Sequence, residues 1–315
     1  MPRDWDADAY DRLPIPMTRW GIEVVGWLEL TDDERVLDAG CGTGQVTREL
    51  LRRLPNGAVV ALDGSPSMIE QARMRLDDDR VEFVVHDLQD PLPITSVDAI
   101  LSTATFHWVT DHERLFANLA SVLRHGGQLA AQCGGAGNTE RLANVLRDLG
   151  YELEEDKLFA GADETRSRLE RAGFDRIECW LHEEPTAIPR GDLELYLRTI
   201  CLGSVLERIP TAEREDVVRR AAERLPDGTI DYVRLNIRAR RALAGSPSAA
   251  RRQMKSETAA SRISASAVAA PIGSSRPSIR SSRLRPRRSI VIWHGISRTP
   301  RSFASAINSS GVATW

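Results

Sequence analysis

The sequence has few cysteines and no long apolar run, and both absences narrow the kind of protein it can be. Its four cysteines, Cys41, Cys133, Cys179 and Cys201, lie far apart without a C-x-x-C pair, so neither a zinc site nor a disulfide framework is indicated. No apolar run approaches the ~20 residues that span a bilayer, and the N-terminus lacks the apolar core of a secretory signal. We therefore expect a cytoplasmic protein with no bound metal and no membrane segment.

Acidic residues are almost missing from the C-terminal part of the chain. Residues 245–315 contain 12 Lys or Arg and one Asp or Glu, although the formal net charge of all 315 residues is −3. The residues before them therefore carry about −14, and an acidic body lacks the basic surface that displaces counterions from nucleic-acid phosphates. With 42% hydrophobic residues, the body can bury a sizeable core. The predicted partner is a small molecule rather than a nucleic acid.

The same C-terminal residues lack the periodicity of a folded domain. They include 17 Ser beside the basic residues, and such a composition buries too little apolar surface to offset the entropy of ordering. We predict a folded domain over 1–244 and a basic, Ser/Arg-rich disordered tail over 245–315. Three origins of the tail stay open: a segment for an anionic partner, an extension without specific function, or an extended or shifted reading frame.

The most informative segment is a short apolar run, Arg35–Ala39, that leads into three glycines at alternate positions. The run has the length of a buried strand, and Gly40, Gly42 and Gly44 permit positive φ and close approach of a ligand to the backbone. A second apolar run, Ala58–Asp63, ends in a carboxylate suited to the hydroxyls of a ribose. The pattern predicts a strand, a turn and a helix start that bind a nucleotide-like ligand.

Spacing and charge narrow the ligand of this turn. A dinucleotide site reads G-x-G-x-x-G and holds a pyrophosphate at the helix N-terminus, whereas this turn reads G-x-G-x-G. Asp38, two residues before the first glycine, would repel a diphosphate but suits a cationic ligand without phosphate. S-adenosylmethionine carries a sulfonium, an ammonium and a ribose, and it fits both features.

This segment resembles the first motif of the class I S-adenosylmethionine-dependent methyltransferases. Downstream, Val81–Val85 with the turn His86–Leu88 resembles the family's third strand, and Val97–Ser102 resembles its fourth. Leu123–Leu129 resembles the turn into the fifth strand, with His125 where a proline is more common. The resemblance covers residues 1–241. It implies an α/β fold, a Rossmann-like seven-stranded, mostly parallel sheet with helices on both faces and an antiparallel last strand.

The resemblance divides the domain into an N-terminal helical lid over 1–34, a cofactor-binding core over 35–135, and substrate-side helices and last strands over 136–244. In the lid, Tyr10 and Trp20 could instead serve only to pack the helices. Two helix starts are predicted from residue chemistry. Ser65 before Pro66 is an N-cap with a proline at the first helical position. Thr110–Glu113 reads as a capping box, for a helix that two glycines at 126 and 127 end.

The resemblance also assigns residues to the cofactor. Asp63 would accept hydrogen bonds from both ribose hydroxyls, and Asp38 would lie near the methionyl ammonium. Asp87 would accept from the adenine amino group, while the Leu88 backbone donates to the ring. The alternatives are a turn residue for Asp63, an acidic loop for Asp87 and ordinary core for Met68. The predicted cofactor set is Asp38, Gly40, Cys41, Gly42, Gly44, Asp63, Gly64, Met68, Asp87, Leu88 and Thr103.

Methyl transfer is an in-line displacement, so the acceptor atom must be held about 3 Å from the methyl group and opposite the sulfur. The segment Thr103–Trp108 leaves the predicted fourth strand at the carboxyl edge of the sheet, where open α/β folds bind ligands. His107 could act there as a base or a hydrogen-bond donor. A purely structural histidine is the alternative.

Two further segments, Phe106–Val109 and Tyr196–Thr199, resemble methyltransferases of the trans-aconitate type, which esterify a carboxylate. The resemblance implies a small-molecule acceptor near Trp108, with Arg198 or Arg190 as its bidentate partner. A surface arginine on an amphipathic helix is the alternative.

Three functions follow from these motifs. The first is O-methylation of a carboxylate, which needs no general base because the acceptor is already ionised. The second is methylation of a hydroxyl or a carbon acid with His107 as base. The third, from another class, is a protein that binds S-adenosylmethionine without turnover.

Overall fold

The computed structural model describes residues 4–13, 16–152 and 157–245, so nearly all of the predicted tail lies outside the described residues. Within those ranges, no helix is long and apolar enough to cross a membrane. The helices are α1 (Ala7–Arg12), α2 (Pro16–Val25), α3 (Gln45–Arg52), α4 (Pro66–Arg75), α5 (His112–Val122), α6 (Glu140–Asp148), α7 (Ala162–Ala172), α8 (Leu193–Tyr196), α9 (Gly203–Arg208) and α10 (Thr211–Glu223), with a 3-10 turn at Phe106–Trp108 and a π-helix at Leu197–Cys201.

The strands form one large sheet and one small one. The large sheet has the order β3-β2-β1-β4-β5-β9-β6, and β7 pairs with β8 separately. Strands β1 to β5 run parallel to one another, whereas β9 runs antiparallel to both β5 and β6. The predicted seven-stranded, mostly parallel sheet is therefore confirmed. The strands are β1 (Arg35–Ala39), β2 (Ala58–Asp63), β3 (Val81–Val85), β4 (Val97–Thr103), β5 (Leu123–Gly134), β6 (Phe174–Glu183), β7 (Thr186–Ala187), β8 (Thr229–Ile230) and β9 (Val233–Arg241).

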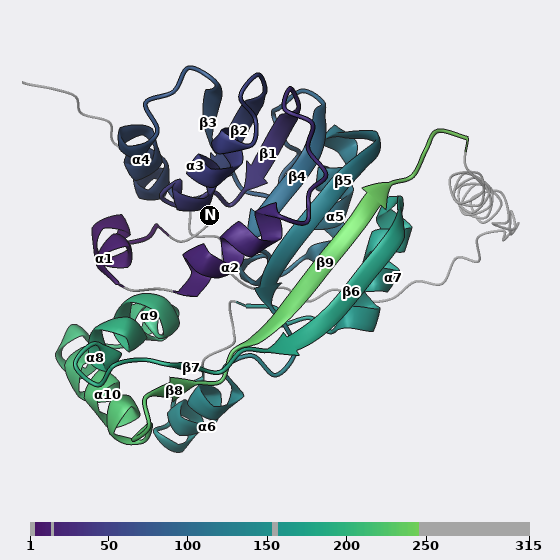
Figure 1. The fold of residues 1–315 in the computed structure, drawn as a ribbon. Helices are drawn as coiled ribbons and strands as arrows, with labels where there is room; N and C mark the ends of the chain where they lie inside the picture. The colour runs from purple at the N-terminus through teal and green to yellow at the C-terminus, as the bar shows by residue number, and fades with distance from the viewer. Residues whose placement is uncertain (1–3, 14–15, 153–156, 246–315) are drawn as a thin grey trace, which may run out of the picture. The chain divides into compact units, whose positions relative to one another are not determined.

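Both faces of the sheet are covered by helices (Figure 1). Successive side chains of a strand point to opposite faces, so neighbours in β1 enter different cores. Val36 packs with Leu50 of α3 in a core that α2 also lines, while Leu37 packs with Leu119 of α5 in a core completed by α7. The continuous apolar pattern of β1 follows from this two-sided burial.

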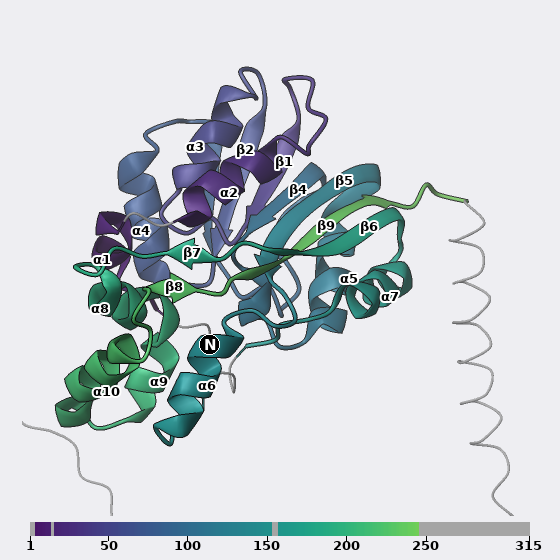
Figure 2. The ribbon, with the colours of Figure 1, turned by 60° about the horizontal axis from the view of Figure 1, so that its bottom comes forward.

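A third core lies beyond the sheet, among the short helices of the C-terminal half. Figure 2 shows α6, α8, α9 and α10 gathered together below the strands, next to β7 and β8. Their buried side chains enclose Tyr196 and Tyr232, and Trp20 of α2 joins them. This group corresponds to the region expected on the substrate side.

The helix starts test the capping arguments. Ser65 caps α4 as predicted, because its hydroxyl accepts from the Met68 N–H at 3.3 Å and Pro66 is the first helical residue. For α5 the prediction is wrong by one residue: Asp111 is the N-cap and accepts from the Arg114 N–H at 3.0 Å. That helix also ends at Val122, before the glycines, since β5 already begins at residue 123.

Candidate active site

A cavity of about 650 Å³ opens where β1, β2, β3 and β4 end. The carboxyl ends of parallel strands meet at one edge of the sheet, so residues distant in sequence converge there. The structure brings most of the predicted site residues together in this cavity. Those that line it are Gly40, Gly42, Asp63, Gly64, Met68, Asp87, Leu88, Thr103, His107 and Trp108.

Two glycines of the turn, Gly40 and Gly44, have different structural roles. Gly40, at φ +87°, lines the cavity, and a Cβ there would collide with the Thr105 side chain. Gly44 lies away from the cavity and caps α3 at φ +79°, where a Cβ would meet a Leu76 methyl group at 2.8 Å. Cys41 also stays outside the main cavity, because its buried side chain packs with Ile69.

Asp63 connects the end of β2 to the glycine turn. One carboxylate oxygen accepts from the Gly42 N–H and the other from the Ser65 N–H, each at 2.9 Å. A carboxylate offers about four lone-pair sites, and backbone N–H groups of Gly42, Gly64 and Ser65 occupy part of them. Burial raises the pKa of Asp63, while the backbone hydrogen bonds oppose that rise. The residue is thus both a turn residue and a cavity acceptor.

Asp38 lies beneath the turn and does not line the cavity. Its side chain is 1% exposed, and one oxygen accepts from the Thr47 hydroxyl at 2.7 Å. The other oxygen has no hydrogen-bond partner among the described residues. Burial is the main reason that the pKa of Asp38 is raised to about 7.

The raised pKa of Asp38 predicts a loss of stability as the pH rises. The unfolded chain gives up this proton near pH 4, whereas the folded chain keeps it until about pH 7. The free energy of unfolding should therefore fall across that window, by on the order of 4 kcal/mol from this group. Asp38→Asn imitates the protonated acid, so the variant should not show this fall in the free energy of unfolding. Urea titrations should show the stability difference between variant and wild type widening from pH 4 to pH 8; a constant difference would contradict the assignment.

The turn after β3 supplies the other predicted cofactor contacts. Asp87 lines the cavity, and one of its oxygens accepts from the Gln89 N–H at 2.9 Å. Leu88 lines it as well, and its carbonyl accepts from the Asn118 side chain at 3.0 Å. Met68 is nearly buried in the same wall. These residues form one end of the cavity.

His107 stands at the other end, on the loop after β4. Its Nδ1 accepts from the Gly134 N–H at 3.2 Å, and its ring stacks on Phe159 with centroids 5.8 Å apart. Because Nδ1 is an acceptor, the ring proton is on Nε2. Burial, with the nearby charges of Arg234 and Lys157, keeps the pKa of His107 well below its ordinary value. The cavity therefore meets a neutral imidazole that can donate a hydrogen bond.

Two cations at this end were missed by the sequence reasoning. Arg234 of β9 lines the cavity, is 2% exposed, and lies 4.7 Å from the centroid of the Trp20 ring. Its Nε donates to the Gln132 side chain at 3.4 Å, and the groups near it in the described ranges are tyrosines and a cysteine rather than a carboxylate. Lys157 lines the cavity with its ammonium 4.5 Å from the Trp108 ring. The strand β9 also carries Asn236, Arg238, Arg240 and Arg241, so no local signal in the sequence singled out Arg234.

The arginines proposed for the acceptor lie elsewhere. Arg198 is in the π-helix and forms a bidentate ion pair with Glu215 on the surface. Arg190 donates to the carbonyls of Ala222 and Leu225, at 3.4 Å and 3.2 Å, near the end of α10. Neither side chain lines the cavity. Both arginines therefore have partners within the protein, Glu215 for Arg198 and the end of α10 for Arg190, rather than in the cavity.

The N-terminal segment contributes aromatic side chains to the cavity. Trp5 and Tyr10 line it, and the Trp5 ring lies edge-on to Trp108 with centroids 5.0 Å apart. Trp20 is buried instead and packs edge-on against Tyr232 at 5.4 Å. Of the two roles considered for these aromatic residues, Tyr10 has the one at the cavity, whereas Trp20 packs in the core.

Comparisons with known proteins agree with this geometry. Residues 37–131 match the methyltransferase domain family. The chain is 37% identical to the trans-aconitate 2-methyltransferase of Acidovorax sp. strain JS42 over 233 residues, which cover 70% of this chain and 89% of that relative. It is 38% identical to malonyl-acyl-carrier-protein O-methyltransferase 1 of Ilyobacter polytropus over 130 residues, 41% of this chain, although that match spans only about half (48%) of the relative.

Solved structures share the fold at lower identity. The YcgJ protein from Bacillus subtilis superimposes with a TM-score of 0.51 at 15% sequence identity, over 71% of this chain and 99% of that one. The chain therefore belongs to the class I S-adenosylmethionine-dependent methyltransferases of the trans-aconitate methyltransferase type, and S-adenosylmethionine is its methyl donor.

Proposed function

We propose that the acceptor is a small molecule whose carboxylate is bound by Arg234 and methylated to an ester. The observation that carries this proposal is the charge of Arg234 in the cavity wall. A buried ion costs several kcal/mol unless it is paired, and among the described residues Arg234 has aromatic rings, a thiol and the Gln132 amide near it but no carboxylate ion pair. An anionic ligand entering the cavity would supply the missing partner, and guanidinium suits carboxylate geometry.

The names of the relatives support the same class of acceptor. One is a trans-aconitate 2-methyltransferase and the other is a malonyl-acyl-carrier-protein O-methyltransferase, and both names denote carboxylate-bearing acceptors. Lys157 adds a second positive charge to the same cavity. Two cations and a neutral histidine donor make this end of the cavity favourable for negative oxygen atoms.

The opposite end of the cavity fits the cofactor. Asp63 lines the cavity with a carboxylate that would accept from the ribose hydroxyls, and Asp87 with Leu88 lines the wall expected for the adenine. Asp38 does not line the cavity, so its carboxylate would act on a cationic ligand only through the backbone of the turn above it. Bound S-adenosylmethionine supplies an electrophilic methyl group on a sulfonium. We assign these residues, with the backbone of Gly40 and Gly42, to holding it.

The protein's own contribution to the reaction is orientation and exclusion of water. Arg234 would fix the acceptor carboxylate, and His107 would donate from Nε2 to one of its oxygens. Trp5 and Trp108, packed edge to face, close the wall around it. An ionised carboxylate is already nucleophilic, so holding it in line with the methyl group accounts for most of the required rate.

The state of His107 argues against the alternative with a general base. Nε2 already carries the ring proton, so it can accept another only if that proton is first moved to Nδ1, where it would face the Gly134 N–H. Arg234 and Lys157 oppose the positive charge that the ring would then carry. We therefore expect His107→Gln, which keeps a donor in the cavity, to retain activity within about tenfold. A general base would contribute about 100-fold or more, so a loss of that size would favour a hydroxyl or carbon-acid acceptor.

The acceptor class is tested by following labelled methyl groups from S-adenosylmethionine into paired compounds. Each pair contains a free carboxylate and the same molecule as its methyl ester or amide, together with alcohols of similar size. We expect label only with free carboxylates, in a product that releases methanol in mild alkali. Alkali-stable label in an alcohol would overturn the proposal, and cofactor binding without turnover of any acceptor would favour the non-catalytic alternative.

A further inference from the structure

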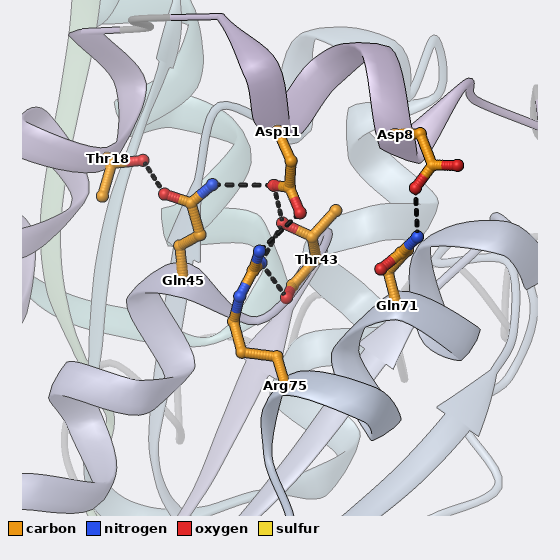
Figure 3. Close-up of polar contacts among 7 residues, drawn as sticks. All are labelled: Asp8, Asp11, Thr18, Thr43, Gln45, Gln71 and Arg75. Carbon is orange, nitrogen blue, oxygen red and sulfur yellow. Dashed lines mark hydrogen bonds and ion pairs between the residues drawn. The ribbon is translucent and has the colours of Figure 1, made fainter.

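The carboxylate of Asp11, in α1, joins the N-terminal segment to the glycine turn (Figure 3). One of its oxygens accepts from the Thr43 hydroxyl and from the Gln45 amide, each at 2.8 Å. The other oxygen forms an ion pair with Arg75 at the end of α4. Asp11 thus connects α1 with the turn, with the first residue of α3 and with α4.

Arg75 strengthens the same junction from the opposite side. Its Nη1 donates to the Thr43 carbonyl at 2.5 Å and to the Thr43 hydroxyl at 2.6 Å. Thr43 lies between Gly42 and Gly44, so the ion pair restrains the backbone of the turn itself. The Thr18 hydroxyl of α2 completes the network by donating to Oε1 of the Gln45 side chain at 2.7 Å.

The position of Asp11 has a physical reason. Gln45 is the first residue of α3, and a helix N-terminus attracts negative charge. In dinucleotide folds a ligand phosphate lies at the helix after the glycine turn; here the chain brings its own carboxylate beside it. Burial opposes ionisation, but the hydrogen bonds from Arg75, Thr43 and Gln45 keep the pKa of Asp11 below its ordinary value. The contact is therefore between full charges at neutral pH.

The junction at Asp11 is relevant to the cofactor because residues next to it line the cavity. Tyr10 is the neighbour of Asp11 and lines the cavity, as does Trp5 just before the helix. Elsewhere in the segment, Asp4 and Trp5 form hydrogen bonds with Ser65 and Ser67 at the start of α4, and Asp8 accepts from the Gln71 amide at 2.5 Å. Asp11 adds a contact of another kind, because it joins the segment to a charged side chain and to the glycine turn.

We propose that Asp11 is a positioning residue for the cofactor: it holds α1 and its Tyr10 over the bound ligand and fixes the glycine turn beneath it. The proposal rests on the S-adenosylmethionine site and not on the identity of the acceptor. It predicts a specific kinetic pattern. Replacing Asp11 should lower the affinity for S-adenosylmethionine and S-adenosylhomocysteine. The rate of methyl transfer in the enzyme with both substrates bound should stay nearly unchanged.

The test compares Asp11→Ala with Asp8→Ala, a matched change in the same helix, in the full chain. For Asp11→Ala we expect the KM for S-adenosylmethionine and the dissociation rate of S-adenosylhomocysteine to rise at least about tenfold. The kcat should stay within about threefold, and the acceptor KM should not change. Asp8→Ala should alter the cofactor constants by less than twofold.

A second variant separates positioning from folding. Asp11→Asn keeps an acceptor for Thr43 and Gln45 but loses the charge facing Arg75, so it should fold and show an intermediate dissociation rate. Unchanged cofactor KM and dissociation rate in both Asp11 variants would overturn the proposal, even if the melting temperature fell. Equal effects of Asp8→Ala would overturn it as well. Dissociation of S-adenosylhomocysteine is measured without acceptor, so this result is independent of the carboxylate assignment.

Discussion

The Asp63→Ala variant is expected to bind S-adenosylmethionine at least about 100-fold more weakly than the wild-type protein. Two hydrogen bonds from ribose hydroxyls to a carboxylate contribute about 3 kcal/mol together, which corresponds to that factor. The substitution also removes the acceptor of the Gly42 N–H, so the glycine turn loses one of its restraints. Isothermal titration calorimetry with the cofactor alone measures the effect directly.

The matched control for this variant is Asp78→Ala. Asp78 is an aspartate far from the cavity, whose partner is the side chain of Arg80. The Asp78→Ala variant should bind the cofactor with the affinity of the wild-type protein. Circular dichroism checks that both variants are folded. Wild-type affinity in Asp63→Ala would contradict the assignment of Asp63 to the ribose.

The second large effect is expected from Arg234→Met, which should lower the activity without lowering the stability. Removing one partner of a buried charged contact costs 2–5 kcal/mol, so kcat/KM for a carboxylate acceptor should fall at least about 100-fold. The free protein, however, loses an unpaired buried charge and gains an apolar side chain. Its melting temperature should therefore be equal to or higher than that of the wild type, while its affinity for S-adenosylmethionine is unchanged.

Arg198→Met provides the comparison for this prediction. It removes a guanidinium that pairs with Glu215 on the surface, and exposed ion pairs contribute little. Its kcat/KM should stay near the wild-type value. If Arg234→Met instead lowered the melting temperature and left acceptor turnover intact, Arg234 would be a structural residue and the carboxylate proposal would lose its main support.

The cofactor half of the site could be predicted because its residues follow one another in short segments. Gly40, Gly42 and Asp63 belong to two strand ends about twenty residues apart, and the sheet places such ends together. The same locality explains the small error at α5. Thr110 and Asp111 are both acceptable N-caps, and only the geometry of the Arg114 N–H distinguishes them.

The acceptor half could not be predicted in the same way. Arg234 reaches the cavity because β9 pairs beside β5, which places it next to Gln132, 102 residues earlier in the chain. Nothing in the local pattern around Arg198 shows that Glu215 neutralises it, and nothing around Asp11 shows that Arg75 lies opposite. Long-range pairing decides which charged side chains are satisfied within the protein and which are left for a ligand.

The antiparallel strand β9 has a consequence for how the protein is made. It lies between β5 and β6, so Ala131 and Cys179 both pair with Ile237. Until β9 emerges from the ribosome, β5 has a partner only in β4, and β6 has none among the strands of the described sheet. Exposed edges are templates for aggregation, and pairings so distant in sequence form slowly. Synthesis that stops before residue 241 should therefore yield chains that depend on chaperones. Because Arg234 is on the same strand, the proposed acceptor site is completed only when β9 has joined the sheet.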